Sequence, residues 1–152
     1  MNTAFVVSGL LLLVGVTGAV QSIRQVGAVA RRTCSALLAL SPLGVILDGI
    51  FTLESMPLHS VGFFLAAATP VLSFLVAGLL LRRVPRWRRF GDWLLLGSPL
   101  TLALLVLFFT TFNPTTSGAG RGVGGLVQRV LIVEVHAWFV ALGWLAFSRS
   151  SG

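Results

Sequence analysis

Charged side chains are scarce in this sequence, and lysine is absent from it. Only 10% of the 152 residues are charged and 56% are hydrophobic, whereas a soluble domain has about 25% charged residues. A water-soluble core formed by a chain of this length could not bury so much apolar surface. The composition therefore excludes a soluble globular protein and indicates an integral membrane protein.

Residues that build disulfides and metal sites are equally few. The single cysteine, Cys34, excludes an internal disulfide and a zinc site made of cysteines. The two histidines, His59 and His136, do not form the i, i+3 or i+4 pair that preorganises a metal site on a helix. The alternating pattern of membrane barrel strands is also missing. We therefore expect helices throughout and no metal or cofactor.

Long apolar runs define the expected architecture. Five of them are long enough to cross a hydrocarbon core of about 30 Å. The sequence thus predicts an all-α polytopic transmembrane bundle, a single transmembrane domain over residues 1–152, with spans at about 4–22, 33–53, 58–81, 92–112 and 126–147. For the first run, the charges favour a retained helix over the alternative of a cleaved signal peptide, because no basic residue precedes it and three arginines follow it.

The arginines predict the orientation of these spans. Nine of them lie in the first and third connections and the C-terminal tail, whereas the opposite side has only Arg121 and Arg129. By the positive-inside rule, the N-terminus is outside and the C-terminus lies in the cytoplasm, across the cytoplasmic membrane. We expect the arginines around Trp87 to contact anionic lipid headgroups and not nucleic acid, with Trp87 and Trp93 at the interface. They are Arg82, Arg83, Arg86, Arg88 and Arg89.

Polar and small residues follow a helical spacing on three expected spans. The second span carries Ser41, Gly44, Asp48 and Thr52, the third carries His59, Gly62, Ala66, Thr69 and Ser73, and the fifth carries Arg129, His136, Val140 and Gly143. Small residues let helices approach closely, and ionisable residues avoid lipid. We therefore expect the three stripes to meet inside the bundle.

The candidate site is the intramembrane polar cluster of Asp48, His59, Arg129 and His136, in the outward-facing half. Asp48 should lie about 7–8 Å below the outer end of its helix, at a rise of about 1.5 Å per residue. In a structural interpretation, Asp48 forms an ion pair with Arg129 and His59 bonds a loop carbonyl. In a functional interpretation, the cluster also binds a ligand or moves a proton. Glu134, two residues from His136, should point away from it.

Two further patterns accompany the cluster. Ser41 or Ser60 with His59 and Asp48 has the residue types of a serine hydrolase, but no nucleophile elbow surrounds either serine. Ser41-Pro42, Thr69-Pro70 and Ser98-Pro99 each place a hydroxyl beside a proline within a span. We expect helix kinks there, with hydroxyls bonding the carbonyls that proline leaves free.

Several segments resemble a known family. "LGVILDGIFTLESMPLHSVGFFLAAATPVLSFLVAGLLLRR", "WRRFGDWLLLGSPLTLALL" and "GGLVQRVLIVEVHAWFVALGW" are similar to the bacterial and archaeal integral membrane proteins grouped as domain of unknown function 998. The resemblance covers most of residues 30–144, and its most specific elements are Gly49-Ile50-Phe51, Leu58-His59 and Gly125-Leu126-x-Gln128-Arg129.

The resemblance implies several membrane helices, usually six, and no assigned activity. The first span of this chain is similar to the family's second, so we expect either that the family's first helix is missing or that the start lies within a longer gene. It also implies that Asp48, His59 and Arg129 belong to a shared pattern, without giving their chemistry.

These observations lead to two function hypotheses. The first is a multi-pass membrane protein that binds or moves a small polar or lipid-like ligand through an outward-facing polar cavity, or supports a partner membrane protein. The alternative is an intramembrane enzyme acting on a lipid headgroup, with His59 as base and Asp48 as the residue that orients it. The expected partners are membrane lipids and a membrane protein.

Overall fold

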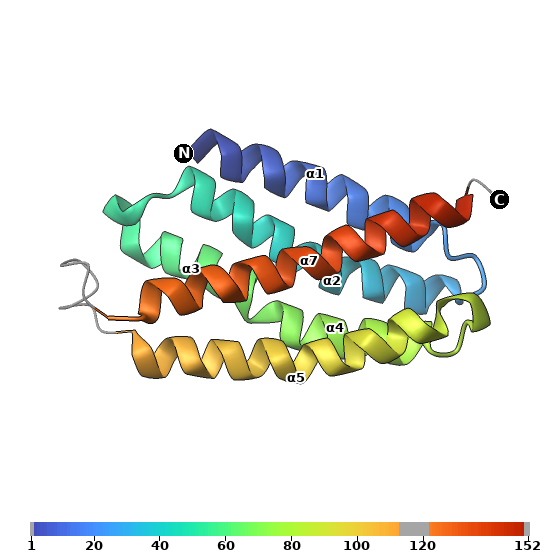
Figure 1. The fold of residues 1–152 in the computed structure, drawn as a ribbon. Helices are drawn as coiled ribbons and strands as arrows, with labels where there is room; N and C mark the ends of the chain where they lie inside the picture. The colour runs from blue at the N-terminus through green and yellow to red at the C-terminus, as the bar shows by residue number, and fades with distance from the viewer. Residues whose placement is uncertain (1, 113–121, 151–152) are drawn as a thin grey trace.

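The computed structural model describes residues 2–112 and 122–150, and all regular elements within these ranges are helices (Figure 1). They are α1 (Asn2–Gln21), α2 (Ala28–Ile50), α3 (Met56–Ala67), α4 (Thr69–Leu81), α5 (Arg88–Thr111) and α7 (Gly124–Ser150), with short 3-10 turns at Leu53–Ser55 and Pro85–Trp87. Five helical stretches are long and apolar enough to cross a membrane, with α3 and α4 together forming the third. The predicted all-α, five-span fold is confirmed. Arg121 lies outside the described residues.

The helices extend beyond the apolar runs that predicted them. α2 starts at Ala28 and includes two arginines, and α5 starts at Arg88. Polar residues can continue a helix past the hydrocarbon core, because only the central residues must be apolar. Asp92 therefore lies inside α5, and its carboxylate accepts from Nε of Arg82 at 2.7 Å.

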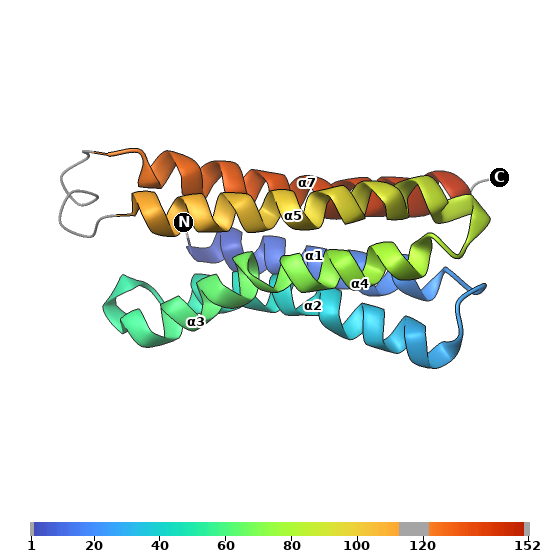
Figure 2. The same cartoon turned by 90° about the horizontal axis from the view of Figure 1, so that it is seen from below.

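Successive spans are neighbours in a closed ring. α1 contacts α2, α2 contacts α3 and α4, α4 contacts α5, α5 contacts α7, and α7 returns to α1. In Figures 1 and 2, the connections α1–α2 and α4–α5 lie at the end where α7 finishes, and the α2–α3 turn lies at the end where α7 begins. We call the first the arginine end, because Arg24, Arg31, Arg32 and the arginines of 82–89 belong to it.

α2 and α3 approach each other where glycine replaces a side chain. A Cβ on Gly44 would overlap the backbone nitrogen of Ala66, and a Cβ on Gly62 would lie 3.0 Å from the backbone nitrogen of Asp48. The predicted stripes of the second and third spans therefore do face each other. Helices in a membrane associate closely at such small residues, since lipid offers no hydrophobic force between them.

The third span is broken at Ala68, between α3 and α4. Pro70 has no N–H, so the carbonyl of Ala66 loses its helical donor. Ser41 of α2 donates its hydroxyl to that carbonyl at 2.8 Å, and Thr69 donates to the carbonyl of Leu65 at 2.6 Å. The expected kink with hydroxyl compensation is thus confirmed at Pro70.

The kink turns α3 away from α5, whereas α4 runs beside α5 (Figure 2). Aromatic side chains bridge part of the separation, with the Phe63 and Phe108 rings 5.0 Å apart. The apolar core fills the ring mainly between α1, α4, α5 and α7, around Phe74 and Leu131. Space therefore remains near the α2–α3 turn.

Exposed aromatic and aliphatic side chains cover the outer surface, as is usual for helices that cross a membrane. Leu11, Leu96 and Trp93 are 69%, 68% and 61% exposed. Trp87, however, is only 4% exposed and packs edge-on against Phe90. Its predicted interface position is wrong, because the 3-10 turn at Pro85–Trp87 directs the indole into the core.

We predict different effects on stability for two glycine substitutions. Gly44→Ala should lower the free energy of unfolding by about 1–3 kcal/mol, because its methyl group meets backbone atoms that cannot yield. Gly143→Ala meets nothing within 4 Å and should be neutral or stabilise α7 by up to about 1 kcal/mol through helix propensity. Unfolding of both variants in mixed micelles measures the difference. Equal effects would contradict the close approach.

Candidate functional site

A pocket of about 730 Å³ opens at the end of the bundle opposite the arginine end. The start of α1, the end of α2, the α2–α3 turn, α3 and the start of α7 form its walls. Its polar lining consists of Asn2, Asp48, Thr52, Glu54, His59, Gln128 and Arg129, and its apolar lining of Phe5, Leu53, Phe63, Ile132 and Val133. We call it the Asp48 pocket.

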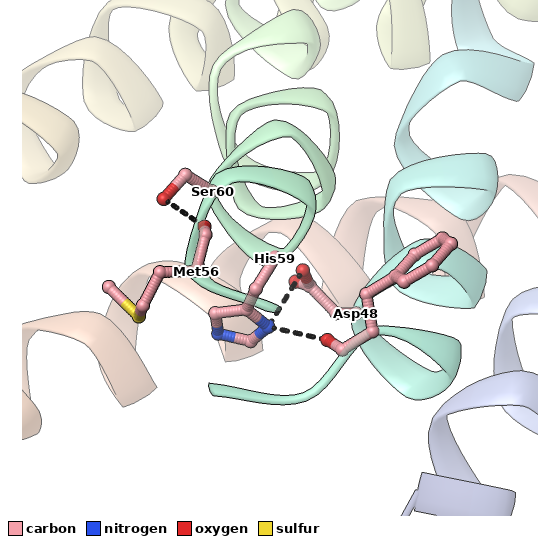
Figure 3. A network of polar contacts seen from close by, with 5 residues as sticks. Asp48, Met56, His59 and Ser60 are labelled. Carbon is pink, nitrogen blue, oxygen red and sulfur yellow. Dashed lines mark hydrogen bonds and ion pairs between the residues drawn. The ribbon is translucent and has the colours of Figure 1, made fainter. Parts of the chain in front are cut away.

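Asp48 and His59 form the pair at one wall of this pocket. The last turn of α2 carries Asp48, and the first turn of α3 carries His59, so the short connection between these helices brings them together. His59 Nδ1 lies 3.4 Å from Asp48 Oδ1 and 3.1 Å from the carbonyl oxygen of Phe51 (Figure 3). The expected contact between His59 and a loop carbonyl is present.

These two contacts assign the tautomer of His59. Both neighbours of Nδ1 are acceptors, so Nδ1 carries a hydrogen and donates it to Phe51. Asp48 Oδ1 then has an electrostatic contact but no hydrogen-bond partner among the residues that the structure describes, although this oxygen is buried. The other ring nitrogen of His59 points away from Asp48 (Figure 3). The pair thus buries one carboxylate oxygen, while the partly exposed remainder of Asp48 and the second nitrogen of His59, which has no partner among the described residues, are left for a ligand.

Arg129 lies on a different wall, in the first turns of α7. Its side chain is exposed, and within the described part of the chain it forms no hydrogen bond or ion pair. The expected Asp48–Arg129 ion pair is therefore not formed between these two described residues, because His59 occupies the position beside Asp48. Both charged groups nevertheless line the same pocket.

His136 does not join the other three residues. Its Nδ1 lies 2.8 Å from the carbonyl oxygen of Ile132, one turn earlier in α7, and its ring lines a groove on the outer face of that helix. Val140 in the same stripe is 66% exposed. The expectation that the third stripe faces inward is wrong. α7 instead buries the apolar side chains of Leu131, Val135, Phe139 and Leu142.

The apolar residues of α7, and not its polar ones, decide which way the helix is rotated. The apolar face of α7 is more continuous than its small, polar face, and it occupies the core.

Glu134, which was expected to point away from His136, does so and accepts hydrogen bonds from the Thr101 hydroxyl, at 3.0 and 3.1 Å, and from Trp138 Nε1. These two donors satisfy the hydrogen-bonding needs of a carboxylate within a membrane span. Glu134 does not line the Asp48 pocket.

The hydrolase pattern does not assemble around His59. Ser60 donates its hydroxyl to the Met56 carbonyl at 2.8 Å (Figure 3), and Ser41 is buried and donates to Ala66. Over residues 2–112 and 122–150, no three His, Cys, Asp or Glu side chains are grouped as a metal site would require. The chemistry available in the pocket is that of the Asp48–His59 pair, Glu54 and Arg129.

A family model described as "Protein of unknown function (DUF998)" matches residues 1–145. No curated protein and no solved structure matches the chain.

Proposed function

The chain belongs to the DUF998 family, and we propose that it is a multi-pass protein of the cytoplasmic membrane that binds a small polar or lipid-like ligand in the Asp48 pocket. One observation supports this function most strongly. A pocket of about 730 Å³ is lined by Arg129, whose guanidinium has no hydrogen bond or ion pair within the described chain, and by the carboxylate of Asp48, which is 14% exposed. Ionisable groups within a membrane span are costly unless they have a partner. A bound ligand would supply partners for both.

The pocket walls favour an amphiphile over a small ion. Phe5, Phe63 and Val133 line it together with the charged groups. Pockets that combine apolar walls with a few convergent polar groups are typical of organic ligands. His136 lies on the outer face of α7 and does not line the Asp48 pocket.

The orientation is part of the proposal. The arginines of residues 24–32 and 82–89 belong to one end of the bundle and the Asp48 pocket to the other. The positive-inside rule places the arginine end in the cytoplasm, so the pocket faces outward. Arg83, Arg86, Arg88 and Arg89 are exposed and would contact anionic lipid of the inner leaflet. Arg82 would contact such lipid while its Nε keeps its ion pair with Asp92.

A second candidate function is an enzyme that acts on a lipid headgroup. The 3.4 Å separation of His59 Nδ1 and Asp48 Oδ1 favours it, because a carboxylate beside Nδ1 orients an imidazole whose other nitrogen acts as a base. Arg129 would bind the phosphate of such a substrate. The hydroxyl of Ser60 is not directed at His59, so water would be the nucleophile.

Blocking the pocket should remove the ligand. We expect wild-type protein purified in a mild detergent to retain about one small molecule or lipid per chain, as a preformed pocket with apolar walls does. Gln128→Trp should fill the pocket and abolish this retention, whereas Gln25→Trp, an exposed position at the arginine end, should not. Native mass spectrometry measures both. The same bound molecules in both variants would contradict the proposed site.

The orientation predicts which end is labelled in whole cells. In a Cys34→Ser background, Ser55→Cys on the α2–α3 turn should react with a membrane-impermeant maleimide. Gln25→Cys, in the α1–α2 connection, should react only after permeabilisation. The reverse pattern would overturn both the orientation and the contact with inner-leaflet lipid.

The enzyme candidate predicts turnover that depends on His59. Wild-type protein in vesicles should release a water-soluble headgroup, and His59→Ala should slow this release by about 100-fold or more, the usual contribution of a general base. Ser60→Ala should leave it unchanged. Absence of release, or equal release by His59→Ala, would exclude the enzyme while leaving ligand binding intact.

A further inference from the structure

The Asp48 pocket continues into a groove along α7. Ile132 and Val133 line both the pocket and a second hollow of about 600 Å³ on the outer face of that helix. The other residues of this hollow, which we call the α7 groove, are His136, Ala137, Val140, Ala141 and Trp144. The groove thus runs from the charged pocket toward the arginine end, along the direction of a lipid chain.

The two charged walls of the pocket require opposite partners. Arg129 is unpaired within the described chain and offers the planar fork of donors that matches a phosphate. On the other wall the Asp48 carboxylate is 14% exposed and lines the pocket, and Glu54 on the turn adds a second carboxylate to that side. A ligand that satisfies both walls must therefore carry an anionic group and an N–H donor of positive charge.

We propose that the ligand is a zwitterionic phospholipid with a primary ammonium headgroup. This inference rests on the proposed function and gives it a ligand class. The phosphodiester lies at Arg129, the ammonium donates to Asp48, and one acyl chain lies in the α7 groove. The continuity of pocket and groove favours a lipid as the source of this headgroup over the free glycerophosphoethanolamine.

Other lipid headgroups satisfy only part of this arrangement. A quaternary ammonium carries positive charge but has no N–H to donate to the Asp48 carboxylate. A phosphoglycerol headgroup brings an anion to Arg129 but no cation to the Asp48 and Glu54 side. Since a hydrogen bond to a charged group contributes about 1.5–3 kcal/mol, the primary ammonium lipid should bind about tenfold or more tightly than either.

The test is a titration of the full-length protein in micelles, followed by native mass spectrometry, with three lipids that have identical acyl chains. The lipids are phosphatidylethanolamine, phosphatidylcholine and phosphatidylglycerol. We expect about tenfold selectivity for the first in wild-type protein. Asp48→Asn should reduce the ratio of phosphatidylethanolamine to phosphatidylcholine affinity to about one, whereas Asp92→Asn should preserve it. Arg129→Gln should weaken all three lipids, and Arg24→Gln should weaken none.

A second arm tests the groove. Val140→Trp should weaken phosphatidylethanolamine, whereas Leu96→Trp, at an exposed position of α5, should not. Glycerophosphoethanolamine should bind wild type more weakly than the lipid does, and equal affinity would overturn the role of the groove. Retention of lipid without headgroup selectivity, or selectivity that survives Asp48→Asn, would overturn this inference while leaving the proposed function in place. Circular dichroism and gel filtration confirm that each variant is folded.

Discussion

The close approach of α2 to α3 and α4 is the contact on which the polar features of this protein depend. Gly44 and Gly62 present no side chains there, so the backbones of the two elements meet directly. That approach lets Ser41 reach the Ala66 carbonyl and places Asp48 beside His59. The same contact stabilises the kink and builds one wall of the pocket. A substitution that disrupts it should therefore affect both the fold and the site.

Hydrocarbon cannot supply hydrogen bonds, and this explains where the pocket lies. Pro70 removes a helical bond within the third span, and only a donor from another helix can replace it. With Ser41 as that donor, the break at Ala68 is tolerated and α3 leaves the line of α4 (Figure 2). The ring is then well filled around Phe74 and open near the α2–α3 turn. A single proline thus separates a packed half of the bundle from a half with space for a ligand.

The sequence was sufficient for the parts of the structure that depend on composition and spacing. Apolar runs predicted the five helical stretches, and the spacing of small residues predicted that Gly44 and Gly62 face each other. It was insufficient where two faces of one helix compete. The stripe of Arg129 and His136 has helical spacing, but burial of Leu131 and Val135 decides the rotation of α7. The bonds of Glu134 to Thr101 and Trp138 depend on that rotation, so only the preference of a buried carboxylate for donors could have suggested them.

The separation of Asp48 from Arg129 follows from how α7 is held. Leu131 and Val135 anchor that helix in the core, and Glu134 bonds it to Thr101 of α5. Neither interaction involves the pocket, so the position of α7 is fixed without an ion pair to α2. His59 meanwhile fixes the Asp48 side through its bond to Phe51. Because separate interactions position Arg129 and Asp48, neither residue needs an ion pair with the other to stay in place. The opposite charges therefore remain apart in a preformed pocket, where the proposed zwitterionic ligand would lie between them.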